Sequence, residues 1–390
     1  MVNPFNFSRL PQIYFGIGKL ELLAGMIERF GKKVVLLTGK SSFLSSRNGA
    51  AFLEKLECSK ITCRHVIVDK EPTPEIIDSI TAGLEDFHPD VVAGIGGGSV
   101  IDAGKAVSAM SGKNVPVVDF LEGVGTKEHP GTKVPYIAVP TTSGTGSEAT
   151  KNAVITRVGR NGFKKSLRHD NLVPDIAVVD PLLTLSCSPE ITAASGMDCF
   201  TQLTEAFLSD KSCEYTDSLA WEGLVAVEAS LIQCYRRGDD QQARAGMSFA
   251  ALTSGICLAN AGLGAVHGFA SSIGGMFSIP HGTLCGTLMA PANEITVMHL
   301  RKDKKNTAAL KKYTRLGRLF VQVEGKSDDY YIDGFIDYLN EITLSLKPPK
   351  LGALGINESN LSEICRKTEI KNNPAKLSQG ELEEILRRRL

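Results

Sequence analysis

Asp198 and Gln202 stand four residues apart in the stretch SGMDCFTQLTEAF, at residues 195–207. On a helix, two residues at this spacing share one face, and the rest of that face is mostly apolar. A buried carboxylate is costly unless it is paired or binds a metal. Asp198 therefore requires a partner on the element that packs opposite it.

Two of the seven histidines, His267 and His281, lie in a glycine-rich stretch at residues 262–286, and a glycine follows each of them. Together with Asp198 they offer one carboxylate and two imidazoles, a ligand set that suits Zn²⁺ or Fe²⁺. Three protein ligands and an open position are typical of a catalytic metal. A hydrogen-bonded structural histidine is the common alternative, and spacing alone leaves it open.

A second chemical signal is the glycine loop GGGSVIDAGKA at residues 96–106, which follows an apolar run and begins a helical pattern. Consecutive glycines let the backbone approach a pyrophosphate, and the helix N-terminus behind them favours anions. The loop at residues 143–149, SGTGSEA, is rich in glycine and hydroxyl groups and also follows an apolar run. Two such loops at the ends of parallel strands indicate a dinucleotide site, although a tight strand-to-helix turn remains the alternative for the first.

The residues after the apolar run at 33–38 bear on the choice between NAD and NADP. An acidic residue at the end of such a strand holds the ribose hydroxyls and repels a 2′-phosphate. Here the chain reads Gly39, Lys40 and Ser41, so no acidic group opposes a phosphate. This stretch favours NADP over NAD.

These residues need a scaffold, and the first half of the chain alternates apolar runs with helical patterns. Strands are predicted at 33–38, 65–69 and 175–180, and the segments at 90–99 and 136–148 are predicted as strands that run into glycine loops. Helices are predicted at 41–57, after EPTPE and after the first glycine loop. Such alternation is typical of a doubly wound parallel sheet. From residue 189 the pattern is helical, so we expect an α/β dinucleotide-binding domain at 1–184 and an all-α domain at 185–390.

Composition excludes several classes of partner. Lys plus Arg and Asp plus Glu number 43 each, so the formal net charge is zero and nothing suggests nucleic-acid or membrane binding. The nine cysteines form no CxxC pair, which favours a reducing cytoplasm. The first residues do not resemble a secretory signal, and no apolar run reaches the roughly 20 residues that a membrane crossing needs.

Over almost its whole length, the chain resembles the group III, iron-dependent alcohol dehydrogenases. The matching stretches are IYFGIGKL, GGGSVIDAGKA, VPTTSGTGSEAT, LVPDIAVVDP, GMDCFTQLTEA and GAVHGFASSIGGMFSIPHG. The resemblance implies hydride transfer between a nicotinamide and a small alcohol or aldehyde, with the carbonyl polarised by a divalent metal. We also expect a homo-oligomer, specifically a dimer.

The resemblance also assigns individual residues. It implies that the pyrophosphate is bound by Gly96, Gly97, Gly98, Ser99 and Asp102, and that the ribose and nicotinamide are approached by Thr141, Thr142 and Ser147. It places Asn152 facing the substrate oxygen and Lys165 near the nicotinamide end of the cleft. Asp198, His267 and His281 match metal ligands.

One position departs from the family. Where the family has D-x-x-x-H with both residues on the metal, this chain has Gln202. An amide is a weaker ligand than imidazole, so Gln202 is either a weak fourth ligand or a hydrogen-bonding group. Glycerol dehydrogenases, relatives in the same superfamily, bind zinc with one Asp and two His. The competing functions are a lyase like the dehydroquinate synthases and a nucleotide-binding descendant without a metal.

Overall fold

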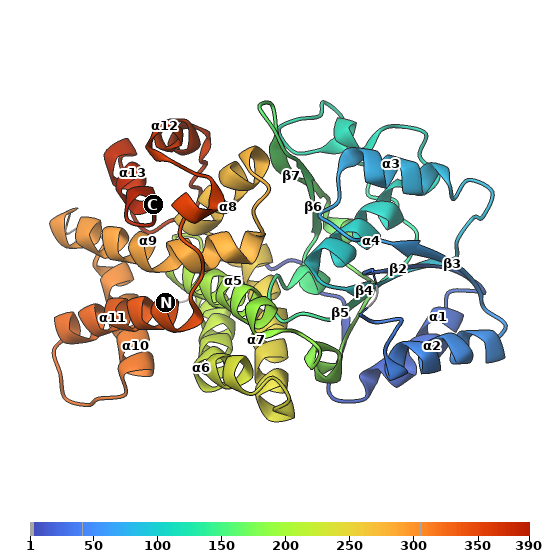
Figure 1. Cartoon of the computed structure of the whole chain (residues 1–390), viewed down its shortest axis with the longest axis horizontal. Helices are drawn as coiled ribbons and strands as arrows, with labels where there is room; N and C mark the ends of the chain where they lie inside the picture. Colours follow the sequence, from blue (N-terminus) through green and yellow to red (C-terminus); the bar gives the residue numbers. More distant parts are fainter. Residues whose placement is uncertain (1–3, 41, 304–305) are drawn as a thin grey trace.

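The computed structural model describes residues 4–40, 42–303 and 306–390. Its N-terminal half is a sheet covered by helices, and its C-terminal half is helical and lies beside it (Figure 1). This is the predicted fold class. The strands are β1 (Gln12–Phe15), β2 (Lys33–Thr38), β3 (Thr62–Ile67), β4 (Val91–Gly96), β5 (Tyr136–Pro140), β6 (Asn152–Arg157), β7 (Phe163–Arg168) and β8 (Ile176–Val179).

Six of these strands form one parallel sheet in the order β1-β8-β5-β4-β2-β3. The chain goes from β2 outward to β3 and then crosses back to β4 on the other side of β2, so the topological switch point lies between β2 and β4. Thr38 pairs with Ile95, which places the carboxyl ends of β2 and β4 at the same edge. Ligands of doubly wound sheets bind at such a crevice, and both predicted cofactor loops start there.

Helices bury both faces of the sheet, as a parallel sheet requires. On one face lie α3 (Pro74–Ala82) and α4 (Gly98–Met110), and on the other lie α1 (Leu23–Glu28) and α2 (Arg47–Cys58). The side chains of β2 alternate between these two layers, and those from 34 to 37 are fully buried. This burial explains why the strand is an unbroken apolar run.

Four details differ from the sequence prediction. The strand β1, which pairs with β8 in the parallel sheet, was not predicted. The helix expected at 41–57 starts at Arg47, because Ser46 caps it by accepting a hydrogen bond from the Gly49 amide at 3.1 Å. The strand expected at 65–69 spans 62–67 and lies at the sheet edge, where its side chains are mostly exposed. The antiparallel β6–β7 pair, which forms a separate two-stranded sheet, was not predicted.

The C-terminal half is built around one central helix, α5, which packs against α6, α7 and α9. The helices are α5 (Pro189–Leu208), α6 (Glu214–Arg236), α7 (Gln241–Ala261), α8 (Ala265–Met276), α9 (His281–Asp303), α10 (Thr307–Val321), α11 (Asp328–Leu346), α12 (Glu358–Lys367) and α13 (Gln379–Arg387). Within the described residues, no single helix is long and apolar enough to cross a membrane. Together α7 and α8 have the length and apolar composition of a membrane span, but the pair is bent by 95°.

Candidate metal and cofactor site

The structure brings Asp198, His267 and His281 together, and it adds Cys285 to them. One ligand atom from each of the four side chains lies within 4.8 Å of the other three. The Asp198 Oδ1 atom is 3.2 Å from His267 Nε2 and 3.5 Å from His281 Nε2. The partner that Asp198 requires is therefore a pair of imidazoles.

Three helices supply this cluster. Asp198 lies in the middle of α5, His267 lies in the first turn of α8, and His281 and Cys285 lie in the first two turns of α9. The start of α9 approaches α5 closely because residue 282 is glycine: a Cβ atom there would lie 2.3 Å from the Ala194 carbonyl oxygen. Any larger residue would push His281 away from Asp198.

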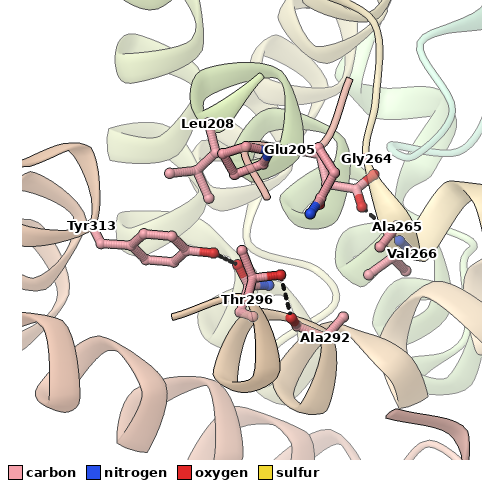
Figure 2. Close-up of a pocket in the computed structure, with 11 residues that line it drawn as sticks. Glu205, Leu208, Gly264, Ala265, Val266, Ala292, Thr296 and Tyr313 are labelled. Atoms are coloured by element: carbon pink, nitrogen blue, oxygen red, sulfur yellow. Dashed lines mark hydrogen bonds between the residues drawn. The ribbon is translucent and has the colours of Figure 1, made fainter. Parts of the chain in front are cut away.

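Glu205 orients His267. Its Oε2 atom lies 2.7 Å from His267 Nδ1, and its Oε1 atom accepts a hydrogen bond from the Val266 amide at 2.7 Å. Figure 2 shows Glu205 beside Gly264 and Val266 at the edge of a small pocket that Tyr313 also lines. Because Nδ1 faces a carboxylate, Nε2 is directed at Asp198, the arrangement in which histidines bind metals.

The protonation of the cluster follows from burial and charge. Burial alone would lower the pKa of His267, but Cys285 and the hydrogen bonds with Asp198 and Glu205 raise it well above its usual value. Burial lowers the pKa of His281 to about 4. Burial opposes ionisation of Asp198, yet His281 and His267 hold the pKa of its carboxyl below the usual value. At neutral pH the proton therefore resides on His267, between two carboxylates.

Gln202 is hydrogen-bonded at both ends of its amide. Its Nε2 donates to Asp198 Oδ1 at 3.2 Å, and its Oε1 accepts from Ser254 Oγ at 3.0 Å. The nitrogen of the amide, which has no lone pair for a metal, thus faces the carboxylate. Of the two roles expected for Gln202, this geometry matches the hydrogen-bonding one.

The two predicted cofactor loops meet at the sheet edge. The Thr141 amide donates to the Gly96 carbonyl at 2.9 Å. A Cβ on Gly97 would lie 3.4 Å from Thr142, and one on Gly98 would lie 2.7 Å from Thr145. Glycine at residue 98 therefore allows the loops to pack against each other in front of the N-terminus of α4, where Ser99 lies in the first turn.

Asp102 and Ser147, which the resemblance assigned to the cofactor, are hydrogen-bonded to each other. Beneath them, the buried Lys105 ammonium donates to the Ser147 carbonyl at 2.8 Å and to the Asn152 carbonyl at 2.8 Å. Burial lowers the pKa of Lys105 to about 8, although Asp102 and Glu148 oppose this shift. This network fixes the second loop relative to α4.

The remaining predicted residues lie on the sheet edge and on the hairpin. Gly39 follows β2, and its carbonyl accepts a hydrogen bond from the Thr38 hydroxyl at 3.0 Å. Lys40 comes next, and Ser41 lies outside the described residues. Asn152 starts β6, with its amide 3.5 Å from the Ser166 hydroxyl.

Lys165 and its neighbour Lys164 point to different partners. Lys165 lies on β7, and its ammonium is 3.5 Å from a carboxylate oxygen of Glu369. Lys164, which sequence analysis did not single out, is buried and pairs with Glu71 at 2.6 Å. The charge of Lys164 contributes to the lowered pKa of His281, so Lys164 is the lysine that acts electrostatically on the cluster.

Cys285 and Glu205 were not predicted as site residues. Both carried a positional signal, because Cys285 stands four residues after His281 and Glu205 stands seven after Asp198. On helices these spacings place side chains on the same face. Neither residue type is specific enough to be chosen without knowing which helices pack together.

Comparison with known proteins identifies the family of this chain. Residues 11–181 match the family described as "Iron-containing alcohol dehydrogenase", and residues 192–390 match "Fe-containing alcohol dehydrogenase family, C-terminal". An NADPH-dependent butanol dehydrogenase from Clostridium saccharobutylicum is 30% identical over 391 residues, which cover 97% of this chain and 96% of the relative. A long-chain-alcohol dehydrogenase from Geobacillus thermodenitrificans is 33% identical, with 96% and 94% of the two chains covered.

Solved structures show the same fold. The alcohol dehydrogenase from Oenococcus oeni superposes with a TM-score of 0.87 at 26% identity, and 99% of this chain and 100% of that chain are covered. The archaeal Red Sea brine pool alcohol dehydrogenase ADH/D1 gives a TM-score of 0.89 at 25% identity, with 100% and 99% covered. The family implies a divalent metal and NAD or NADP. The chain therefore belongs to the iron-containing alcohol dehydrogenase family and is an oxidoreductase that acts on alcohols.

Proposed function

We propose that Asp198, His267 and His281 hold the divalent metal of an enzyme that interconverts a small aliphatic aldehyde and its primary alcohol, with NADP as the preferred cofactor. The observation that carries this proposal is the convergence of the three side chains from three helices. The relatives support the substrate class, because they include a butanol, a long-chain-alcohol and a 1-propanol dehydrogenase.

The donor set fits a divalent metal. Asp198 is only 2% exposed, and a carboxylate this buried needs a cation or a strong partner. Within the described part of the chain, His281 Nδ1 is buried and has no hydrogen-bond partner, so the polar contacts of this imidazole are those of its Nε2 with Asp198 and Cys285. Glu205 acts as the carboxylate that often supports a metal-binding histidine.

When bound, the metal polarises the carbonyl oxygen and the reduced nicotinamide supplies the hydride. The chain itself supplies binding and orientation. Gly96, Gly97, Gly98 and Ser99 are proposed to bind the pyrophosphate at the N-terminus of α4, where the helix dipole favours anions. Asp102 and Ser147 then act mainly by fixing the second loop, as their mutual hydrogen bond suggests.

Three further assignments complete the proposed site. Thr141 and Thr142 are proposed to contact the ribose and nicotinamide, since both follow β5 at the crevice. Asn152 is proposed to face the substrate oxygen, and Lys165 to lie near the nicotinamide end. The resemblance to the family supports these two roles, and the link between the Asn152 backbone and buried Lys105 supports a fixed position for Asn152.

The preference for NADP rests on the residues after β2. Gly39, Lys40 and Ser41 offer no carboxylate to oppose a 2′-phosphate, and a Cβ on Gly39 would meet no atom within 4 Å. The first relative described above is named as NADPH-dependent. The open space and the positive charge are compatible with the larger cofactor.

The proposed function is tested by assaying a panel of straight-chain aldehydes with NADPH and NADH, on protein loaded with Zn²⁺ or Fe²⁺ or treated with chelator. We expect metal-dependent reduction of short aldehydes and a lower KM for NADPH. Turnover that is unaffected by removal of the metal would contradict the metal site. A protein that binds cofactor but reduces no aldehyde in the panel would instead be the non-catalytic descendant.

A further inference from the structure

Cys285 occupies a position that the proposed metal site does not explain. It stands four residues after His281 on α9, so the two side chains share a face of that helix. Its sulfur is fully buried and lies 3.7 Å from His267 Nε2 and 3.8 Å from His281 Nε2. Cys285 is a free thiol, and the imidazole nitrogens it faces are the same two that face Asp198.

The spacing of these atoms matches the edges of a coordination tetrahedron. Zinc bonds of about 2.0–2.1 Å to nitrogen or oxygen and about 2.3 Å to sulfur, at tetrahedral angles, separate two light ligand atoms by about 3.3 Å and a light atom from sulfur by about 3.6 Å. The observed distances are 3.2 and 3.5 Å between nitrogen and oxygen, and 3.7 and 3.8 Å between nitrogen and sulfur. Four of the six edges are therefore close to those of a tetrahedron, and all four ligand atoms lie within 4.8 Å of one another, as binding of a single cation by all of them requires.

Gln202 does not compete for this position. Its amide is held between Asp198 and Ser254, with its nitrogen toward the carboxylate. Turning the amide over would place its oxygen against the Asp198 oxygen, so that two acceptors would face each other. The hydrogen bonds of Gln202 thus keep its oxygen away from the cluster, while the Cys285 sulfur points into it.

We infer that Cys285 is the fourth protein ligand, bound as a thiolate, and that it makes this site selective for Zn²⁺ over Fe²⁺. This inference rests on the proposed metal site. On binding, the Cys285 thiol and the Nε2–H group of protonated His267 each lose one proton to solvent, and the sulfur and the nitrogen each donate an electron pair to the cation. The charges of the Asp198 carboxylate and the Cys285 thiolate then balance a divalent cation inside a buried cluster. Soft thiolate ligands favour zinc, and zinc can expand from four to five ligands, so substrate access is retained.

The test is the absorption spectrum of the whole protein after its metal has been exchanged for Co²⁺. We expect one cobalt per chain and a strong sulfur-to-cobalt charge-transfer band in the near ultraviolet. Cys285→Ser should lose this band and keep the weaker visible bands of cobalt. Cys257→Ser is the matched control, since Cys257 is equally buried but its thiol contacts the Thr216 carbonyl of α6 and it is not among the four clustered residues. This variant should keep the full spectrum.

X-ray absorption at the zinc edge of the wild-type protein gives a second readout that does not depend on a variant that folds. We expect one sulfur at about 2.3 Å among nitrogen and oxygen neighbours at about 2.0 Å. A zinc or cobalt ion bound with only nitrogen and oxygen neighbours would overturn the role of Cys285 and leave the three-ligand site intact. A protein that retains neither ion would overturn both proposals.

Discussion

The contact between Glu205 and His267 offers a prediction whose size follows from the structure. Glu205→Gln preserves the shape of the side chain but replaces one acceptor oxygen by an NH₂ group. In the wild-type protein the two carboxylate oxygens serve two donors, the Val266 amide and His267 Nδ1, each at 2.7 Å. In either orientation of the new amide, one of these N–H groups faces another N–H group.

The substitution also changes which nitrogen of the His267 imidazole carries a proton, and this affects metal binding. If His267 Nδ1 loses its acceptor, the neutral ring favours a proton on Nε2, which is the nitrogen directed at Asp198. A hydrogen bond to a charged group contributes about 1.5–3 kcal/mol, and about 1.4 kcal/mol corresponds to a tenfold change in affinity. We therefore expect Glu205→Gln to weaken zinc binding about 10- to 100-fold, the range typical of such supporting groups.

The assay is the zinc dissociation constant at pH 7, measured by competition with a chromophoric chelator, together with the thermal midpoint of the apo protein. Glu190→Gln is the matched control, because Glu190 lies at the exposed start of the same helix and should leave zinc affinity unchanged. A Glu205→Gln protein that folds and binds zinc within twofold of the wild type would refute the role of Glu205.

The other predictions concern the ligands, the cofactor loops and a buried carboxyl. Asp198→Asn should lose the metal and turnover yet bind NADPH normally, as fluorescence titration can show; turnover retained with normal metal content would contradict it. Gly39→Asp should weaken NADPH more than NADH, because a carboxylate repels the 2′-phosphate; equal changes in the two affinities would count against this. Gly98→Val should weaken both cofactors, because even a Cβ would lie 2.7 Å from Thr145, and unchanged titrations would refute the close packing of the loops. Burial raises the pKa of Glu148 from 4.5 to about 7. Between pH 4.5 and pH 7 the folded protein therefore binds more protons than the unfolded chain. The free energy of unfolding falls as the pH rises through this range, by about 3 kcal/mol in all. Glu148→Gln should show a smaller fall in thermal midpoint between pH 5 and pH 8 than the wild type does. Equal falls in the two proteins would contradict the raised pKa.

The helices and strands that could be predicted from the sequence are those in which burial determines the local composition. β2 is buried on both faces, so it is an apolar run. The outer helices α10 and α13 show a helical period because one face of each packs inward. The β6–β7 hairpin was missed because its strands are short and partly exposed and carry several charged residues. Its position depends on contacts with α4 and α8 that are distant in sequence.

The residues of the candidate site were also predicted only in part. Asp198, His267 and His281 are conspicuous because carboxylate and imidazole groups are unusual among apolar and glycine-rich neighbours, and the resemblance to a family connected them. Cys285 was passed over because a buried cysteine usually behaves as a small apolar residue. Glu205 was passed over because its role depends on where α8 begins relative to α5, and the sequence of neither helix reveals that.

The central claim is that one divalent cation is held by Asp198, His267 and His281 between their three helices. The most direct measurement is anomalous diffraction from crystals of the metal-loaded protein, with data collected on both sides of the absorption edge of the metal. We expect a single strong anomalous peak within bonding distance of Asp198 Oδ1 and of the Nε2 atoms of His267 and His281. A peak bonded to other residues, or no peak in protein saturated with metal, would contradict it.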